Sequence, residues 1–391
     1  MNYLEAGIEV LKMIEMNGYE AYFVGGFVRD RLLGIESNDI DIATNALPNQ
    51  IANIFQVVNT GLKYNCVTIE YEGFSFETTT YRLEGSYADY RHPTYEVGKV
   101  ITDDLKRRDF TINAMAMNKD LEIVDLFGGL QDLENKIIKT VNEPQKRFTE
   151  DALRMLRAAY FAAKLGFLIE NETLFAMKKY SYLVQNLSLD RITWELEKLI
   201  NSKFQSIGIN YLIETNIAFY LGDFKNAIFL IKEKSISDIT WDEFVAISYY
   251  EDLDGLNLVH LKNNLTNHIK SAIKLTKELK KNKFERIHLF EYGLNVCMLA
   301  NRINVLLFGY KDNSKQIAEE YQKLPIYSLS ELKINGNDIL ENIDIKDKRE
   351  ISGILQEVKR LVLLEKLTNE KECILKYIKR HYWFEIFKYC V

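Results

Sequence analysis

The chain has 391 residues and a formal net charge of −6; 47% of its residues are hydrophobic and 27% charged, which is typical of a globular protein with two to four compact units. The negative charge by itself does not indicate nucleic-acid binding, because phosphate contacts need Lys and Arg. The sequence has no apolar run near the ~20 residues that span a bilayer, no leader, and no Cys-x-x-Cys spacing among its four cysteines, so we expect a cytoplasmic protein with no membrane contact, structural zinc or disulfide framework.

Glycine and proline divide the chain near residue 150. Three of the four prolines and over half of the glycines precede it, and long helix-like periods follow. This pattern predicts a mixed α/β domain followed by an all-helical remainder. The first element is a helix over residues 3–17, with Leu4, Ile8, Leu11 and Ile14 on one face and Gly18 after its end.

Residues 22–34 combine a short strand, a glycine turn and a helix. The apolar run Tyr22–Val24 stops at Gly25-Gly26, a helical pattern follows, and Gly34 closes it. A glycine turn at the head of a helix offers bare backbone amides that can hold phosphates. Alone, such a pair is more often an ordinary tight turn.

The next segment, Asp39-Ile40-Asp41-Ile42, alternates with the period of a strand. The isoleucines then point into a core while Asp39 and Asp41 project together from the opposite face. Two carboxylates on one face repel each other unless a cation lies between them. Beside the glycine turn, the pair indicates a metal ion bound to a nucleoside triphosphate; a surface Asp pair is the alternative.

A short helix over residues 48–55 and a hairpin follow. The hairpin joins residues 67–71 to residues 74–78 through Glu72-Gly73. Glu77, on its second strand, is either a third carboxylate beside the Asp pair or a solvated strand residue. Residues 84–99 have no sustained period and are expected to form a loop, in which Tyr87, Tyr90 and Arg91 can stack on bases or sugars.

The string Arg107-Arg108-Asp109-Phe110-Thr111-Ile112-Asn113-Ala114 carries two adjacent arginines. Guanidinium is a fixed fork of donors that suits a triphosphate or ribose, although a bare Arg-Arg pair is usually solvent-exposed.

A helix is expected from Glu150 to about Leu165, and it places Asp151 and Arg154 on one face. The pair is either a surface ion pair or a reader of bases. A carboxylate accepts from an exocyclic amino group while guanidinium donates to a ring nitrogen, which fits cytosine and adenine. Uracil and guanine present the reverse pattern and would leave partners unpaired.

Two later segments carry charge patterns. Arg191, Glu195 and Lys198 are spaced along a helix within residues 187–200, and we interpret them as ion pairs that brace a helix junction. Residues 260–286 are rich in lysine, which is typical of a solvated helix face; with an RNA substrate, such a face is the expected dock for its backbone.

Together these motifs resemble one family. Gly25-Gly26-x-x-Arg29-Asp30, the Asp39-x-Asp41-Ile42-Ala43-Thr44 string, the double-arginine string and Glu150-Asp151-x-x-Arg154 are similar to the signatures of class II tRNA nucleotidyltransferases, the CCA-adding enzymes. Bacterial poly(A) polymerases are close relatives. The resemblance is strong over residues 21–200 and weaker after them.

The resemblance implies a fold and an activity. The fold is an α/β nucleotidyltransferase head (1–135) with a mixed sheet, then an all-α neck (136–200), body (201–325) and tail (326–391) that binds tRNA. The activity is template-independent addition of CCA to the 3′ end of the tRNA acceptor stem from CTP and ATP, with release of pyrophosphate. No protein partner is implied.

The resemblance also assigns roles to residues. Asp39 and Asp41 would bind Mg²⁺ as catalytic carboxylates. Glu77 is the third candidate catalytic carboxylate, from its position on the predicted hairpin and not from the resemblance. The nucleotide-binding residues would be Gly25, Gly26, Arg29, Arg108, Asn113, Asp151, Arg154 and Arg157. The alternatives are a CC-adding or A-adding enzyme, a poly(A) polymerase, or a non-catalytic RNA-binding protein on the same scaffold.

Three positions depart from the family pattern. Tyr64-Asn65-Cys66 replaces the usual His-Gly-Thr, Tyr160 stands where an arginine is common, and Asn38 stands where a basic residue is frequent. None of them removes a residue that the chemistry requires. No His is followed by Asp, so an appended metal phosphohydrolase of the HD type is not expected.

Overall fold

A computed structural model of the chain describes residues 1–37, 39–61, 65–87, 93–279, 281, 283–342 and 349–382. The chain divides into two compact units, Met1–Trp241 and Asp242–Val391. The finer division into head, neck, body and tail stays a prediction. Across the described residues, none of the helices is both long and apolar enough to cross a membrane.

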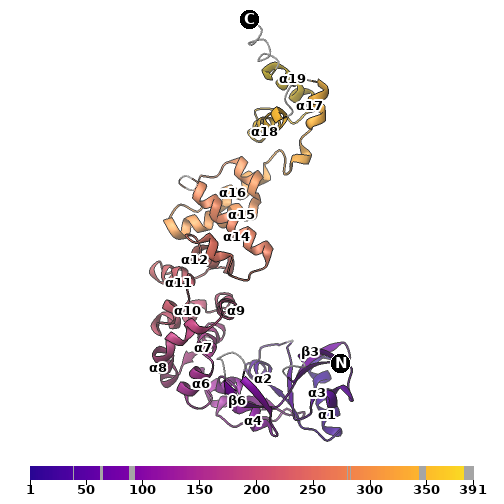
Figure 1. The fold of residues 1–391 in the computed structure, drawn as a ribbon, viewed down its shortest axis with the longest axis vertical. Helices are drawn as coiled ribbons and strands as arrows, with labels where there is room; N and C mark the ends of the chain where they lie inside the picture. Colours follow the sequence, from indigo (N-terminus) through magenta and orange to yellow (C-terminus); the bar gives the residue numbers. More distant parts are fainter. Residues whose placement is uncertain are drawn as a thin grey trace. The chain divides into compact units, whose positions relative to one another are not determined.

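A seven-stranded sheet organises the N-terminal part of the first unit (Figure 1). Its order is β3-β4-β5-β2-β1-β8-β9, formed by β1 (Ala21–Val24), β2 (Asp41–Thr44), β3 (Val57–Gly61), β4 (Cys66–Tyr71), β5 (Phe74–Thr80), β8 (Met115–Met117) and β9 (Ile123–Asp125). The pair β2–β5 is parallel and the other pairs are antiparallel. The predicted mixed sheet is confirmed.

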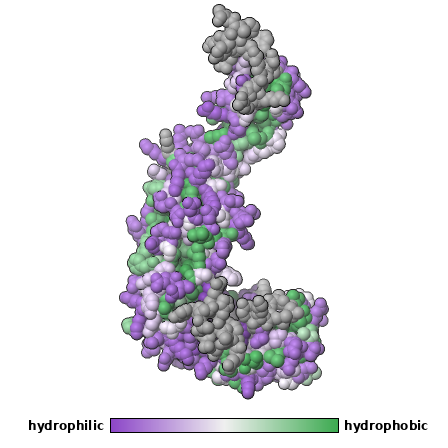
Figure 2. Space-filling view, viewed as in Figure 1, coloured by the Kyte–Doolittle hydropathy of each residue, from purple (hydrophilic) through white to green (hydrophobic). Residues whose placement is uncertain are grey.

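Helices accompany this sheet at short intervals along the chain. They are α1 (Tyr3–Met16), α2 (Gly26–Leu32), α3 (Pro48–Ala52), α4 (Ile101–Lys106) and α5 (Gly129–Glu134). Leu11 and Ile14 of α1 are fully buried, and the Tyr3 hydroxyl donates to the Ser75 carbonyl at 2.6 Å, which ties this helix to β5. On the face shown in Figure 2, hydrophilic residues cover most of both units and apolar residues form small groups.

The strand register brings the carboxylates together. The predicted hairpin is confirmed: β4 and β5 are antiparallel, with Tyr71 opposite Phe74. The parallel pairing of β2 with β5 then places Asp41 opposite Glu77. The strand begins at Asp41, so the prediction that Asp39 lies within it is wrong, although Ile40 is buried as expected.

The expectation of a loop over residues 84–99 is only partly correct. Strands β6 (Arg82–Tyr87) and β7 (Pro93–Val97) pair antiparallel in a separate two-stranded sheet. Cross-strand backbone pairing supplies the regularity here, which the irregular side-chain pattern does not signal. Tyr90 and Arg91 lie outside the described residues.

The rest of the chain is predominantly helical. In the first unit it comprises α6 (Pro144–Glu150), α7 (Leu153–Leu165), α8 (Asn171–Tyr180), α9 (Leu189–Ile200), α10 (Gln205–Glu214) and α11 (Phe224–Glu233). A short parallel pair, β10 (Ile137–Ile138) with β11 (Leu168–Ile169), is the exception in a neck predicted to be all-α.

The second unit follows with helices alone among its described elements. They are α12 (Trp241–Ser248), which starts at the boundary, α13 (Leu253–Leu256), α14 (Asn263–Glu278), α15 (Arg286–Phe308), α16 (Ser314–Gln322), α17 (Gly336–Asn342), α18 (Arg349–Leu363) and α19 (Lys371–Tyr382). The lysine-rich segment forms α14, whose buried residues include Ile269 and Ile273.

Replacing Gly208 with Ala is expected to lower the free energy of unfolding by about 1–3 kcal/mol in urea titrations, because α7 and α10 pack too closely for a side chain. An added Cβ would lie 2.8 Å from the Ala159 carbonyl oxygen and 2.9 Å from the Ala163 Cβ. Gly353 in α18 is the matched control, since among the described residues nothing lies within 4 Å of a Cβ added there. Gly353→Ala should stabilise by up to about 1 kcal/mol, and equal effects at both positions would contradict this account.

Candidate active site

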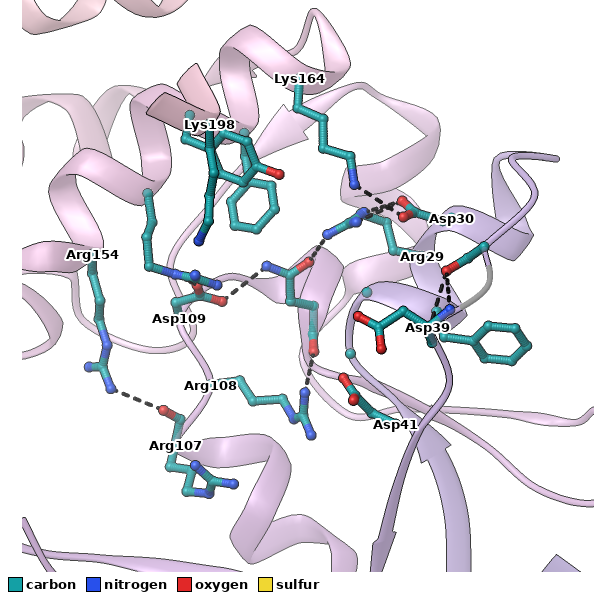
Figure 3. A pocket seen from close by; sticks show the side chains of 18 of the residues that line it. Arg29, Asp30, Asp39, Asp41, Arg107, Arg108, Asp109, Arg154, Lys164 and Lys198 are labelled. Atoms are coloured by element: carbon teal, nitrogen blue, oxygen red, sulfur yellow. Dashed lines mark hydrogen bonds and ion pairs between the residues drawn. The ribbon is translucent and has the colours of Figure 1, made fainter. Parts of the chain in front are cut away.

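A cavity of about 630 Å³ lies in the first unit (Figure 3). It is lined by Gly25, Gly26, Phe27, Arg29, Asp30, Ser37, Asp39, Asp41, Arg107, Arg108, Asp109, Asn113, Asp151, Arg154, Arg157, Tyr160, Phe161, Lys164 and Lys198. Every nucleotide-binding and metal-binding residue predicted from the sequence is in this set. Glu77 does not line the cavity, but its strand position is opposite Asp41.

The two aspartates stand at the start of β2. Burial raises the pKa of the Asp41 carboxyl to about 6, with further increases from Asp39 and Glu77, and Arg108 opposes them. A carboxylate that is costly to ionise beside two others favours a cation as its neighbour. This donor set fits a hard divalent metal.

The carboxylates of Asp39 and Asp41 line an open cavity, so a metal ion held by them is accessible to ligands from outside the protein. No group of three or more His, Cys, Asp and Glu residues is gathered closely enough to hold a metal ion in the part of the chain that the structure describes. Magnesium is usually bound through one or two carboxylates, with substrate phosphates and water completing its octahedron. Asp39 and Asp41 match that arrangement.

Gly25 lets the side chains of Arg108 and Asp41 lie close to the backbone at the head of α2. Its φ of 71° and ψ of −133° belong to a region that residues with a side chain rarely adopt. An added Cβ would lie 2.8 Å from the Arg108 Nη1 and 3.6 Å from the Asp41 Oδ2. The glycine turn therefore keeps a guanidinium and a carboxylate close to bare backbone at the head of α2.

A single buried carboxylate anchors both adjacent arginines. Asp104 accepts from Arg107 Nη2 at 2.6 Å and from Arg108 Nη2 at 2.9 Å. Burial opposes ionisation of Asp104, but Arg108 and Arg107 hold its pKa below the ordinary value. Arg108 also donates from Nη1 to the Asn113 carbonyl at 3.4 Å, so its position is fixed before any ligand binds.

A hydrogen-bonded chain forms another wall. Arg29 donates to the Asn113 side chain, Asn113 donates to Asp109 at 3.0 Å, and Asp109 accepts from Arg157 Nε at 2.6 Å. Burial disfavours the charged Asp109, but Arg157 and then Asn113 keep its pKa low. Phe161 lies close to Arg29 and Arg157, whose guanidinium carbons are 5.1 Å and 5.2 Å from the centroid of its ring.

The structure corrects the predicted helix over residues 150–165. Helix α6 ends at Glu150, and Asp151 is extended, with φ of −147° and ψ of 105°, before α7 begins at Leu153. The Asp151 carboxylate accepts from the Leu153 amide at 3.0 Å, and such capping of a new helix explains the break.

Asp151, at the break, and Arg154, in the first turn of α7, still line the same cavity. Asp151 accepts from Arg191 Nη2 at 2.9 Å. Arg154, 8% exposed, donates to Glu150 at 2.9 Å and to the Arg107 carbonyl at 3.1 Å. The pair is therefore held in place by partners on the surrounding helices.

Several lining residues were missed by sequence reasoning. Lys164 pairs with Asp30 at 3.2 Å, and Lys198, interpreted above as purely structural, points into the cavity in Figure 3. Tyr160 was noted only as a departure. Asp109 belongs to the double-arginine string and was therefore recognisable as a candidate site residue. Lys164 and Lys198 stand in ordinary helical patterns that do not indicate a site. Of the other departures, Asn38 and Tyr64 lie outside the described residues.

In the presence of EDTA, Asp41→Asn is expected to raise the free energy of unfolding at pH 8 by about 2 kcal/mol and to leave it nearly unchanged at pH 4. The folded-state pKa of Asp41 is about 6, against 3.8 for the free group. The folded protein thus binds this proton more tightly, so its contribution to stability is complete below pH 3.8 and is lost as pH rises through about 6. Urea titrations at both pH values test this, and a larger gain at pH 4 would contradict it.

Comparison with known families covers most of the chain. Residues 21–139 match the poly A polymerase head domain, and residues 166–222 match a probable RNA and SrmB-binding site of polymerase A. Residues 254–378 match tRNA nucleotidyltransferase domain 2.

Whole proteins match over nearly their full length. The chain is 35% identical over 387 residues to the CCA-adding enzyme of Ligilactobacillus salivarius, covering 95% of each, and 36% identical over 375 residues to that of Anoxybacillus flavithermus, covering 93% and 94%. The crystal structure of the Bacillus stearothermophilus CCA-adding enzyme in complex with CTP matches with a TM-score of 0.86 at 29% identity, over 99% of this chain and 100% of that one.

Proposed function

This chain belongs to the CCA-adding enzymes, and we propose that it adds C, C and A in turn to the 3′ end of tRNA, from CTP and ATP, with release of pyrophosphate. One observation carries the proposal: a single cavity is lined by the aspartate pair, by several arginines, and by the Asp151 and Arg154 pair. Transfer chemistry, triphosphate binding and base selection can therefore act on one nucleotide.

Asp39 and Asp41 are proposed to hold the divalent metal, which we take to be Mg²⁺ because the donors are carboxylates with room for phosphates. When bound, the metal lowers the pKa of the primer 3′-OH and neutralises charge on the phosphate. Glu77, opposite Asp41, adds negative charge next to this pair from the neighbouring strand. It is proposed to support the pair as a third carboxylate.

The triphosphate is proposed to lie between the glycine turn and the arginines. Arg108 and Arg157 keep side-chain exposures of 19% and 32%, so both can still donate to phosphate oxygens. Arg29 is almost completely buried and is bonded to Asp30 and Asn113. Arg29 and Asn113 are thus proposed to contact the nucleotide as a rigid pair. Gly25 and Gly26 are proposed to let its phosphates approach the backbone amides.

Base selection is assigned to Asp151 and Arg154. Cytosine offers its N4 amino group beside N3, and adenine offers its N6 amino group beside N1, so each supplies a donor to the carboxylate and an acceptor to the guanidinium. Uracil and guanine present a carbonyl beside a ring N–H, so the carboxylate would face an acceptor and the guanidinium would face a donor. A fixed side-chain pair can therefore accept C and A without a nucleic-acid template.

The test is single-turnover extension of a tRNA that ends at its discriminator base, with Mg²⁺ and with CTP, ATP, UTP and GTP separately and then mixed. CTP alone should give two additions, and CTP with ATP should give three and then stop. A stop after two would indicate a CC-adding enzyme, and extension only of a CC-ended tRNA an A-adding one. A long A ladder would indicate a poly(A) polymerase, and no product from folded protein would leave only RNA binding.

A further inference from the structure

One face of α9 carries residues that line the cavity or lie next to it. Arg191, Trp194 and Lys198 are spaced three and four residues apart, which puts them on the same side of the helix. Arg191 contacts the base-reading Asp151 and Lys198 lines the cavity. Trp194 lies between these two on the helix and is 68% exposed.

The Lys198 ammonium lies between two aromatic rings. Its Nζ is 5.8 Å from the ring centroid of Tyr160 and 5.2 Å from that of Trp194. Buried Glu195 accepts from the same Nζ at 3.0 Å and so holds the ammonium in place. Tyr160, Lys198 and Trp194, which we call the stacking strip, therefore run from the cavity wall to the protein surface.

The chemistry of the stacking strip fits single-stranded RNA. Aromatic faces stack on any base, and a cation between them can pair with the phosphate that joins two nucleotides. The Trp194 ring is 68% exposed and lies next to a residue that lines the cavity, so its face is accessible to a base on a strand that enters the cavity. Tyr160 and Lys198 line the cavity, so an RNA strand bound along the stacking strip has one end in that cavity.

We propose that the stacking strip binds the last unpaired nucleotides of the RNA primer, with bases on Trp194 and Tyr160 and a backbone phosphate on Lys198. This assignment rests on the proposed function, since it places the RNA 3′ end in the same cavity as the incoming nucleotide. Tyr160, which replaces the arginine common in this family, provides an aromatic face where a cation is usual.

The experiment compares Trp194→Ala, Trp194→Phe and Tyr160→Phe with the wild type, in two assays. The first measures KM for a tRNA primer, KM for CTP, and kcat. The second measures RNA binding without nucleotides, from quenching of tryptophan fluorescence and from a filter assay. Phe175→Ala is the matched control, because Phe175 is 70% exposed on α8 of the same unit but does not line the cavity.

Trp194→Ala should raise KM and Kd for RNA about tenfold or more, with KM for CTP unchanged. Both phenylalanine variants keep a ring and should recover most of the affinity. Trp194→Phe should also lower the fluorescence quenching well below that of the wild type, and the quenching that remains measures the contribution of the two other tryptophans, Trp241 and Trp383. Phe175→Ala should match the wild type in every measurement.

Unchanged RNA affinity in Trp194→Ala would overturn the proposal, and so would a raised KM for CTP with unchanged RNA binding. An equal loss in Phe175→Ala would also overturn it, because any exposed aromatic side chain would then serve. Failure of the proposed function is distinct: the wild type would then add no nucleotides, while the binding assay would still report on the stacking strip.

Discussion

Asp41→Asn is expected to lower kcat/KM for nucleotide addition about a thousandfold or more. The side chain keeps its shape, but the cavity loses one of the two carboxylates proposed to hold the metal, and metal stabilisation of phosphoryl transfer is worth several kcal/mol. The loss should appear in kcat, in a quench-flow assay with saturating CTP and tRNA. RNA binding without nucleotide should stay within about twofold of the wild type.

Asp120→Asn is the matched control for this variant. Asp120 belongs to the same unit, its side chain is 61% exposed, and it pairs with Lys119 at the surface. The control should retain full activity. Activity of Asp41→Asn within tenfold of the wild type, at saturating metal, would contradict a role for this carboxylate in metal binding.

Asp151→Asn should weaken selection between pyrimidines. An amide can donate to the uracil O4 as well as accept from the cytosine N4, whereas a carboxylate can only accept. Each unpaired buried partner costs about 1–3 kcal/mol, so the ratio of kcat/KM for CTP to that for UTP should fall about tenfold to a hundredfold. Parallel single-turnover measurements with each nucleotide on a discriminator-ended tRNA give this ratio.

Arg191→Ala separates base reading from structural support. It removes the ion pair that Asp151 makes with Arg191 and leaves the carboxylate in the cavity. The CTP to UTP ratio should then change by less than threefold. A loss of selection equal to that of Asp151→Asn would contradict this expectation and show that Asp151 selects the base only while Arg191 holds it. Glu172→Ala, at an exposed position of α8, is the neutral control.

Local patterns were enough to predict the parts of the site that lie on short segments. The hairpin and the aspartate pair follow from period-two alternation and turn residues. The parallel pairing that sets Glu77 opposite Asp41 joins segments 36 residues apart, and the hairpin pattern alone left Glu77 as either a third carboxylate or a solvated strand residue. Its placement on the neighbouring strand is confirmed, and its role stays a prediction.

Two features of the site were not predicted from local patterns, one because two local signals compete and one because it depends on long-range packing. The break at Asp151 depends on side-chain capping of the Leu153 amide, and helical periodicity continues through it. An Asp is a strong N-cap residue, so the signal was present but was outweighed by the surrounding pattern. Lys164 and Lys198 look like surface lysines, because only the packing of separate segments creates the cavity they enter.

The Arg107 carbonyl oxygen connects the residue proposed to read the base with a residue proposed to bind the triphosphate. This atom accepts from Arg154 at 3.1 Å, and its peptide leads directly into Arg108, which faces the glycine turn. Arg154, proposed to read the base, is thus linked through one hydrogen bond and one peptide unit to Arg108, proposed to bind the triphosphate. Because the two proposed sites share this peptide, we expect an incorrect base that moves the Arg107 backbone to lower the rate of bond formation as well as nucleotide affinity.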